Sequence, residues 1–318
     1  MNTIHKLPNS AASPRRSRRL KRIAALPALL TLGNLIFGFA AIHFAARPEP
    51  VITGDSAAIL QRVLPSNLAI AAYMLLAGML CDAFDGRVAR LTRQTSDFGG
   101  QLDSLADIVS FGIAPAFMIT CLIGATLEGR AISPISDAFW GRLTWTMAAI
   151  YVACAALRLA RYNVETMGQN ATHVTTGFKG FPTPGAAAVI VGLILVHEEV
   201  LRRAGEKAVV SKLADPVAYA MPFIALGLGL LMVSRLPYVH MGNTFFRGRK
   251  PFFQIVLMVI FFILAWIQPI FVFAACMCIY AISTPAQHLW LRVFRSAQPA
   301  GSKKPIPEKN HADHEKTA

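Results

Sequence analysis

The sequence has 318 residues, of which 54% are hydrophobic and only 15% are charged. An average soluble domain is about 45–50% apolar and about 25% charged, so this chain has too few charges to cover a water-exposed surface. Its charged residues also alternate with apolar stretches of about 20 residues, the length that crosses a bilayer as a helix. The composition therefore excludes soluble, collagen-like and disordered classes and predicts an all-α polytopic membrane protein.

In chain order, eight apolar segments are candidate membrane spans. They are residues 23–45, 66–86, 101–127, 140–160, 181–197, 216–234, 251–268 and 270–290. The last two are separated by a minimal turn at Gln268 and Pro269 and are expected to form a hairpin. Polar tails over 1–22 and 291–318 are predicted to be disordered, which leaves one membrane domain over 23–290.

The distribution of Lys and Arg predicts the orientation of these spans. With a cytoplasmic N-terminus, 23 of the 31 Lys and Arg residues fall on the cytoplasmic side. Of the rest, four lie in one loop, 198–215, which fits the rule least well; they are Arg202, Arg203, Lys207 and Lys212. We therefore expect a multi-pass protein of the cytoplasmic membrane with both termini in the cytoplasm.

The formal net charge of +14 would also fit a nucleic-acid-binding protein. However, the basic residues lie at the ends of apolar segments and not along one face. We therefore expect membrane lipids, and no nucleic acid, among the partners of this chain. The basic N-terminal tail is interpreted as an anchor at the membrane surface.

Four acidic residues lie at the facing ends of the second and third spans. They are Asp82, Asp85, Asp103 and Asp107. Spacings of i,i+3 and i,i+4 place each pair on one helix face, and the short connection 87–100 makes the two spans antiparallel neighbours. Four carboxylates that converge at the cytoplasmic edge of a membrane repel one another and are costly to desolvate without cations. Mg²⁺ and Mn²⁺ are the natural partners of such oxygen ligands.

A longer pattern surrounds these aspartates. It reads Asp82-x2-Asp85-Gly86-x2-Ala89-Arg90-x8-Gly99-x3-Asp103-x3-Asp107, eight fixed positions within 26 residues. The pattern resembles, position for position, the signature of the CDP-alcohol phosphatidyltransferase family. Residues 31–34, 110–116, 158–163 and 181–184 are similar to the phosphatidylserine synthase branch of that family. The resemblance implies a six-helix core followed by a C-terminal helix pair, and a homodimer.

The resemblance also implies a reaction. The phosphatidyl group of CDP-diacylglycerol would be transferred to the hydroxyl of L-serine, which gives phosphatidylserine and CMP in phospholipid biosynthesis. The same chemistry with glycerol phosphate, inositol phosphate or choline as acceptor is the nearest alternative. A cation transporter is the alternative from another class, but transport carboxylates usually lie near the bilayer midplane in broken helices. These four lie at one face of the membrane.

The roles of single residues follow from the same resemblance. The four aspartates would hold two divalent ions, Mg²⁺ or Mn²⁺, and Asp107 would also be the general base. Gly86, Arg90 and Ser96 match positions that contact the CDP-diacylglycerol.

For the acceptor, the cytoplasmic segment 158–180 offers only three cations, Arg158, Arg161 and Lys179. This small number favours an acceptor with one negative charge, such as serine, over a phosphate, which would need a denser basic cluster. A membrane-anchoring role is the alternative for the two arginines.

Overall fold

The computed structural model describes residues 14–48, 66–92, 97–127, 138–167, 180–204, 215–236 and 252–295, together with positions 132 and 135. Every regular element in these ranges is helical, as the sequence predicts. The helices are α1 (Pro14–Ala45), α3 (Asn67–Thr92), α4 (Asp97–Asp107), the π-helix η1 (Ile108–Ile113), α5 (Ala114–Thr126), α6 (Phe139–Met167), α7 (Thr183–Ala204), α9 (Asp215–Val233), α11 (Phe252–Ile267) and α12 (Pro269–Arg295).

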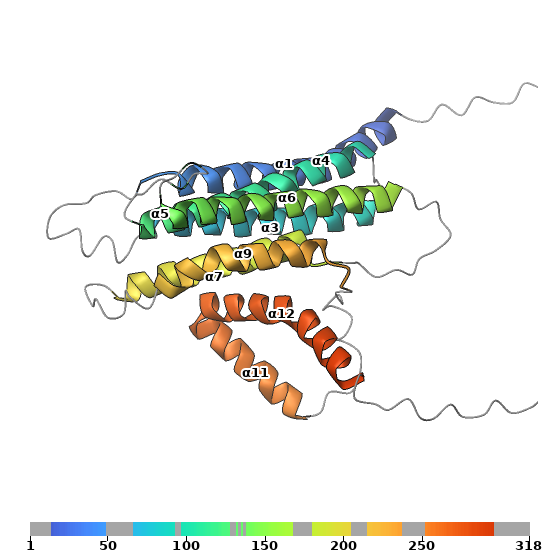
Figure 1. Cartoon of the computed structure of the whole chain (residues 1–318). Coiled ribbons are helices and arrows are strands. Elements are labelled where there is room, and N and C mark those ends of the chain that lie inside the picture. The colour runs from blue at the N-terminus through green and yellow to red at the C-terminus, as the bar shows by residue number, and fades with distance from the viewer. Residues whose placement is uncertain are drawn as a thin grey trace, which may run out of the picture.

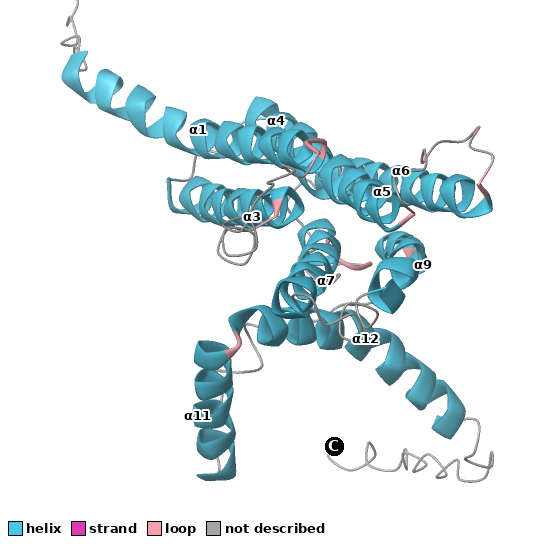
Figure 2. Ribbon diagram, turned by 90° about the vertical axis from the view of Figure 1, so that its left-hand side faces the viewer, coloured by secondary structure: helices cyan, strands magenta, loops and turns pink. Residues whose placement is uncertain are grey.

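Within the described ranges, seven helical stretches are long and apolar enough to cross a membrane, and α4, η1 and α5 together make one of them. The chain is therefore a multi-pass membrane protein. The predicted span 251–268 corresponds to α11, which has 16 residues. A helix of this length covers about 24 Å, less than the roughly 30 Å of a hydrocarbon core. α11 leaves the bundle at an angle and packs on α12 (Figure 2).

The spans alternate in direction along the bundle (Figure 1). α1 packs most extensively on α3, α6 packs on α9, and α12 packs on α7 on the side away from α1. Because of the alternation, the N-terminus of α1, the end of α3, the start of α4 and the start of α7 lie at one end of the bundle. These helix ends flank segments that the sequence predicts to be cytoplasmic.

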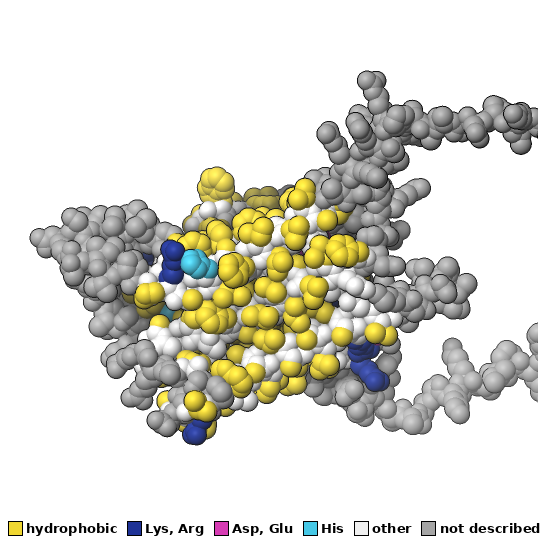
Figure 3. Space-filling model, turned by 90° about the horizontal axis from the view of Figure 1, so that it is seen from above, with side chains coloured by type: hydrophobic (Ala, Val, Ile, Leu, Met, Phe, Trp, Pro, Cys, Tyr) yellow, Lys and Arg dark blue, Asp and Glu magenta, His cyan; other side chains and the backbone are white. Residues whose placement is uncertain are grey.

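The surface of the bundle is apolar between its two ends. In Figure 3, hydrophobic side chains cover the middle of one face, and Lys and Arg side chains lie only toward its ends. Large residues such as Leu29, Ile36 and Phe39 on α1 are more than half exposed. In a multi-pass membrane protein such residues face lipid, so leaving them exposed does not place apolar surface in water.

Two glycines allow the closest approaches between segments in the described part of the chain. A Cβ at Gly38 would clash with the Ser110 side chain and lie 2.9 Å from the Ser110 Cα, so α1 touches η1 only because residue 38 lacks a side chain. Gly180 has a φ of +93°, and its N–H donates to the Leu236 carbonyl at 2.9 Å. Only glycine adopts this conformation without strain, so Gly180 fixes how the chain enters α7.

We expect Gly38→Ala to destabilise the protein, because the Ser110 backbone cannot move away without shifting η1. Overpacking of this kind costs roughly 1–3 kcal/mol. The thermal unfolding midpoint in detergent measures it. The matched control is Gly227→Ala on α9, where a Cβ would meet nothing within 4 Å. Equal midpoints for Gly38→Ala and the wild type would contradict the close contact between α1 and η1.

Candidate functional site

The ends of α3 and α4 bring three acidic side chains together. One carboxylate oxygen from each of Asp82, Asp85 and Asp103 lies within 4.8 Å of the other two. Asp82 and Asp85 come from the last turns of α3, and Asp103 comes from α4, which runs back along the bundle. Asp107 lies one turn beyond Asp103 and is not part of this group. The spacing of the sequence motif therefore produces a group of three carboxylates with a fourth beside it.

The donor set of this group fits a hard divalent cation. None of the three aspartates forms an ion pair with a described residue. The Oδ1 atom of Asp103 is buried and accepts no hydrogen bond within the described part of the chain. Buried charges in proteins are paired or coordinate metals, and carboxylate oxygens are the ligands that Mg²⁺ and Mn²⁺ prefer.

Helix α1 orients two of the four carboxylates. The Thr31 hydroxyl donates to Oδ2 of Asp85 at 2.9 Å, and the Asn34 amide donates to Oδ1 of Asp107 at 3.2 Å. Thr31 and Asn34 are both buried and lie three positions apart, so they share one face of α1. Neither was among the predicted site residues, although both belong to the segment 31–34 that resembles the phosphatidylserine synthase branch. The resemblance of that segment was the signal in the sequence that could have identified both residues.

Asp107 occupies a distinct environment at the start of a π-helix. Its side chain is only 8% exposed, and η1 begins at the next residue. Isolated π-helical turns are rare and occur frequently at functional sites. The Ser110 hydroxyl donates to the Asn34 carbonyl at 2.9 Å, and the Tyr151 hydroxyl donates to the Phe111 carbonyl at 2.8 Å. These bonds tie η1 to α1 and α6 and hold Asp107 in place.

The two arginines predicted to bind the acceptor lie in different surroundings. Arg158 is half-buried, donates to the Thr183 hydroxyl at the start of α7 and interacts electrostatically with Asp107. The Nε atom of Arg161 donates to Glu165 at 2.8 Å, with side chains that are 38% and 53% exposed. Of the two, Arg158 is therefore the arginine whose charge acts on Asp107, and Arg161 is in a surface ion pair.

The remaining predicted residues are described only in part. Gly86 lies exposed on α3, and a Cβ there would meet nothing within 4 Å, so the space beside its backbone is open. Arg90 belongs to the last turn of α3, but its side chain lies outside the described residues. Ser96 and Lys179 also lie outside the described ranges.

Comparisons with known proteins agree with the motif. The family model for CDP-alcohol phosphatidyltransferase matches residues 24–233. A CDP-diacylglycerol–serine O-phosphatidyltransferase of Helicobacter pylori is 29% identical over 269 residues, which cover 84% of this chain and 92% of the relative. The enzyme of the same name from Bacillus subtilis is 29% identical over 215 residues, which cover 68% of this chain and 90% of the relative. A third enzyme of this name, from Mycobacterium tuberculosis, is 28% identical over 227 residues, which cover 71% of this chain and 65% of the relative.

If the three grouped carboxylates hold a divalent ion, Asp85→Asn should weaken Mn²⁺ binding at least tenfold, about 1.4 kcal/mol. Electron paramagnetic resonance of Mn²⁺ titrated into the purified protein measures this without any substrate. Glu165→Gln is the matched control, because it removes a carboxylate near the same end of the bundle but outside the group. Equal Mn²⁺ affinities of Asp85→Asn and the wild type would exclude Asp85 as a ligand.

Proposed function

Because this chain belongs to the CDP-alcohol phosphatidyltransferase family, we propose that it transfers the phosphatidyl group of CDP-diacylglycerol to the hydroxyl of L-serine. The products are phosphatidylserine and CMP. The observation that carries the proposal is the group formed by Asp82, Asp85 and Asp103 within the family motif, with Asp107 beside it. Serine as the acceptor is supported by the relatives from Helicobacter, Bacillus and Mycobacterium, which are all named for serine.

Asp82, Asp85, Asp103 and Asp107 would hold the divalent ions, Mg²⁺ or Mn²⁺, that we propose as cofactors. Bound there, such ions neutralise the diphosphate of CDP-diacylglycerol and the charge that develops on the leaving CMP. The open space beside Gly86 supports its proposed contact with the nucleotide, since any side chain would project into that space. Arg90 and Ser96 remain the proposed partners of the same substrate.

Asp107 is the proposed general base. Its carboxylate takes the proton from the serine hydroxyl as the serine oxygen attacks the phosphorus that carries the diacylglycerol. One P–O bond forms to serine, and the P–O bond to CMP breaks. The location of Asp107 beside the group of three supports this role, because its carboxylate can take a proton while the other three aspartates hold an ion. The Asn34 amide donates to Oδ1 of Asp107, which leaves Oδ2 as the oxygen that takes the proton.

Arg158 is the stronger candidate for holding the serine carboxylate. Serine carries its carboxylate and its hydroxyl on neighbouring carbons, so the cation that binds the carboxylate must lie close to the base. The electrostatic interaction of Arg158 with Asp107 supports this role. Arg161 and Lys179 stay in the proposal as further acceptor-binding residues, and the ion pair between Arg161 and Glu165 would have to open for Arg161 to take part.

We further propose that the end of the bundle with the aspartates faces the cytoplasm and that the enzyme is a homodimer in the cytoplasmic membrane. The excess of Lys and Arg in the segments that share this end supports the orientation. It also gives the site access to serine and returns CMP to the same compartment. The homodimer rests on the family resemblance.

The activity is tested by CMP release from CDP-diacylglycerol with purified protein and four acceptors: serine, glycerol phosphate, inositol phosphate and choline. We expect serine to give the fastest release and chelation of divalent ions to stop it. Asp103→Asn, which keeps the shape of the side chain, is the inactive control. Faster release with glycerol phosphate would overturn the assignment of serine and leave the membership of the family intact.

Arg158→Gln should raise the KM for serine at least tenfold, about 1.4 kcal/mol of binding, and leave the KM for CDP-diacylglycerol nearly unchanged. Arg161→Gln should raise the KM for serine by less, because its side chain is engaged at the surface. Steady-state kinetics with each substrate varied in turn separates the two effects, and unfolding midpoints check that both variants are folded. A larger effect at Arg161 than at Arg158 would reverse this assignment.

A further inference from the structure

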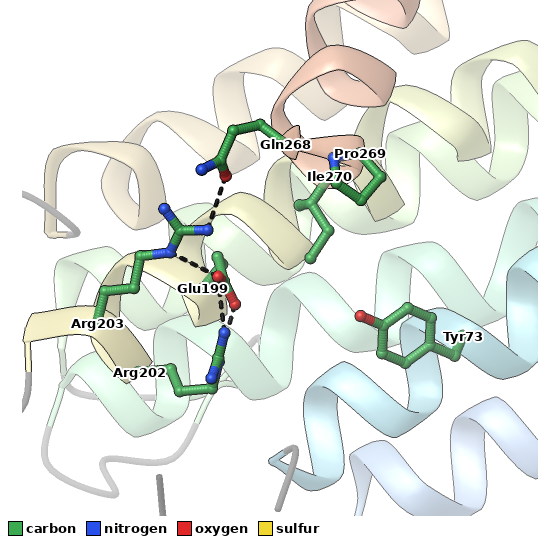
Figure 4. A pocket seen from close by; sticks show the side chains of 7 residues that line it. All are labelled: Tyr73, Glu199, Arg202, Arg203, Gln268, Pro269 and Ile270. Carbon is green, nitrogen blue, oxygen red and sulfur yellow. Dashed lines mark hydrogen bonds and ion pairs between the residues drawn. The ribbon is translucent and has the colours of Figure 1, made fainter. Parts of the chain in front are cut away.

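A second polar site lies at the end of the bundle opposite the aspartates. It is a cavity of about 400 Å³ between α3, the end of α7 and the turn that joins α11 to α12 (Figure 4). The residues that line it are Tyr73, Glu199, Arg202, Arg203, Gln268, Pro269 and Ile270. None of these residues takes part in the proposed transfer reaction.

Two arginines are held at this cavity by one buried carboxylate. Arg202 donates from Nε and Nη2 to the two oxygens of Glu199 at 2.9 and 2.8 Å. Arg203 donates from Nε to Glu199 at 2.6 Å and from Nη2 to Oε1 of Gln268 at 2.7 Å. The Arg203 guanidinium also lies 5.4 Å from the ring centroid of Phe271. Both cations are thus fixed in position, although their side chains are 45% and 48% exposed.

The charge of the lining favours an anion. The cavity has two arginines and one glutamate, which leaves one positive charge, and a phosphodiester has one negative charge. A guanidinium has five N–H donors, and the bonds to Glu199 and Gln268 use two of those on Arg203. The Tyr73 hydroxyl, which can also donate, faces the cavity from α3 (Figure 4). Arginine forks match the oxygens of a phosphate better than any other side chain does.

The position of the cavity favours a lipid as the source of that anion. The spanning stretch of α7 ends at Ala204, directly after the two arginines, so the cavity lies at the level of the headgroups. Beside it, Ile263, Leu264 and Ile267 of α11 are at least half exposed and apolar, as an acyl chain requires of its neighbours. The two arginines, which lie in the last turn of α7, also belong to the segment 198–215 that the sequence predicts as a loop and whose basic residues fit the positive-inside rule least well. Basic pockets between membrane helices bind acidic headgroups on the cytoplasmic side of membranes, and the same pairing of arginine with phosphate is available at this end of the bundle.

We propose that this cavity binds the phosphodiester of an anionic phospholipid in the leaflet opposite the aspartate group. The lipid contacts α3 through Tyr73, α7 through Arg202 and Arg203, and the hairpin through Gln268. It therefore ties α11 and α12 to the rest of the bundle. A ligand that binds only the folded state stabilises it in proportion to the logarithm of its concentration.

The test uses the full chain in phosphatidylcholine nanodiscs to which phosphatidylglycerol is added. We expect phosphatidylglycerol to raise the unfolding midpoint of the wild type and native mass spectrometry to detect it as a retained lipid. Arg203→Gln should lower the apparent affinity for phosphatidylglycerol at least tenfold. Arg142→Gln is the matched control, since Arg142 is an exposed cation at the same end of the bundle that does not line the cavity, and it should behave as the wild type.

Tyr73→Phe provides a second test that removes one hydroxyl and no charge, so it remains informative if Arg203→Gln does not fold. It should weaken the retention of phosphatidylglycerol and leave the unfolding midpoint in pure phosphatidylcholine unchanged. Equal retention by Tyr73→Phe, Arg142→Gln and the wild type would overturn the proposal. So would equal stabilisation by inorganic phosphate alone, because it would identify the site as one for a free anion.

Discussion

Carboxylates that form no ion pair with a described residue, at the end of a membrane span, are the constraint on which the rest of this structure depends. Water solvates an aspartate well, but a partly buried aspartate needs either hydrogen-bond donors or a cation. Here one carboxylate oxygen from each of three aspartates lies within 4.8 Å of the other two. α1 supplies a donor to Asp85 and another to Asp107, and it reaches them because Gly38 lets it approach η1 closely. The packing of the first three spans therefore also positions the carboxylates that we propose as metal ligands.

The two ends of the bundle satisfy their charges in opposite ways. At one end, carboxylates exceed the described cations around them, and the deficit of positive charge fits divalent metal ions. At the other end, two arginines share one glutamate, and the excess of positive charge fits a lipid phosphate. Between the two ends, the bundle is apolar and has no proposed role in binding either ligand. The opposite charges of the two ends give this multi-pass enzyme one end for the proposed reaction and one end that meets only lipid and solvent.

The fold and the core of the site could be predicted from sequence because both depend on local spacing. Apolar segments of the right length define the spans, and i,i+3 and i,i+4 spacings place each pair of aspartates on one face. The different surroundings of Arg158 and Arg161 were not predicted, since residues three apart lie on nearly the same face. The presence of Glu165 four positions after Arg161 was the signal for a surface pair. The π-helix after Asp107 and the cavity at the hairpin depend on contacts between distant segments, which periodicity does not contain.

The most direct test of the central claim is pulsed electron-nuclear double resonance on the Mn²⁺-loaded protein with bound CDP-diacylglycerol. If the aspartates of α3 and α4 hold the ion against the diphosphate, the spectrum will contain a ³¹P coupling of the size expected for a directly coordinated phosphate. The coupling will be absent in Asp85→Asn. A Mn²⁺ signal without ³¹P coupling, recorded while CDP-diacylglycerol is bound, would contradict the account.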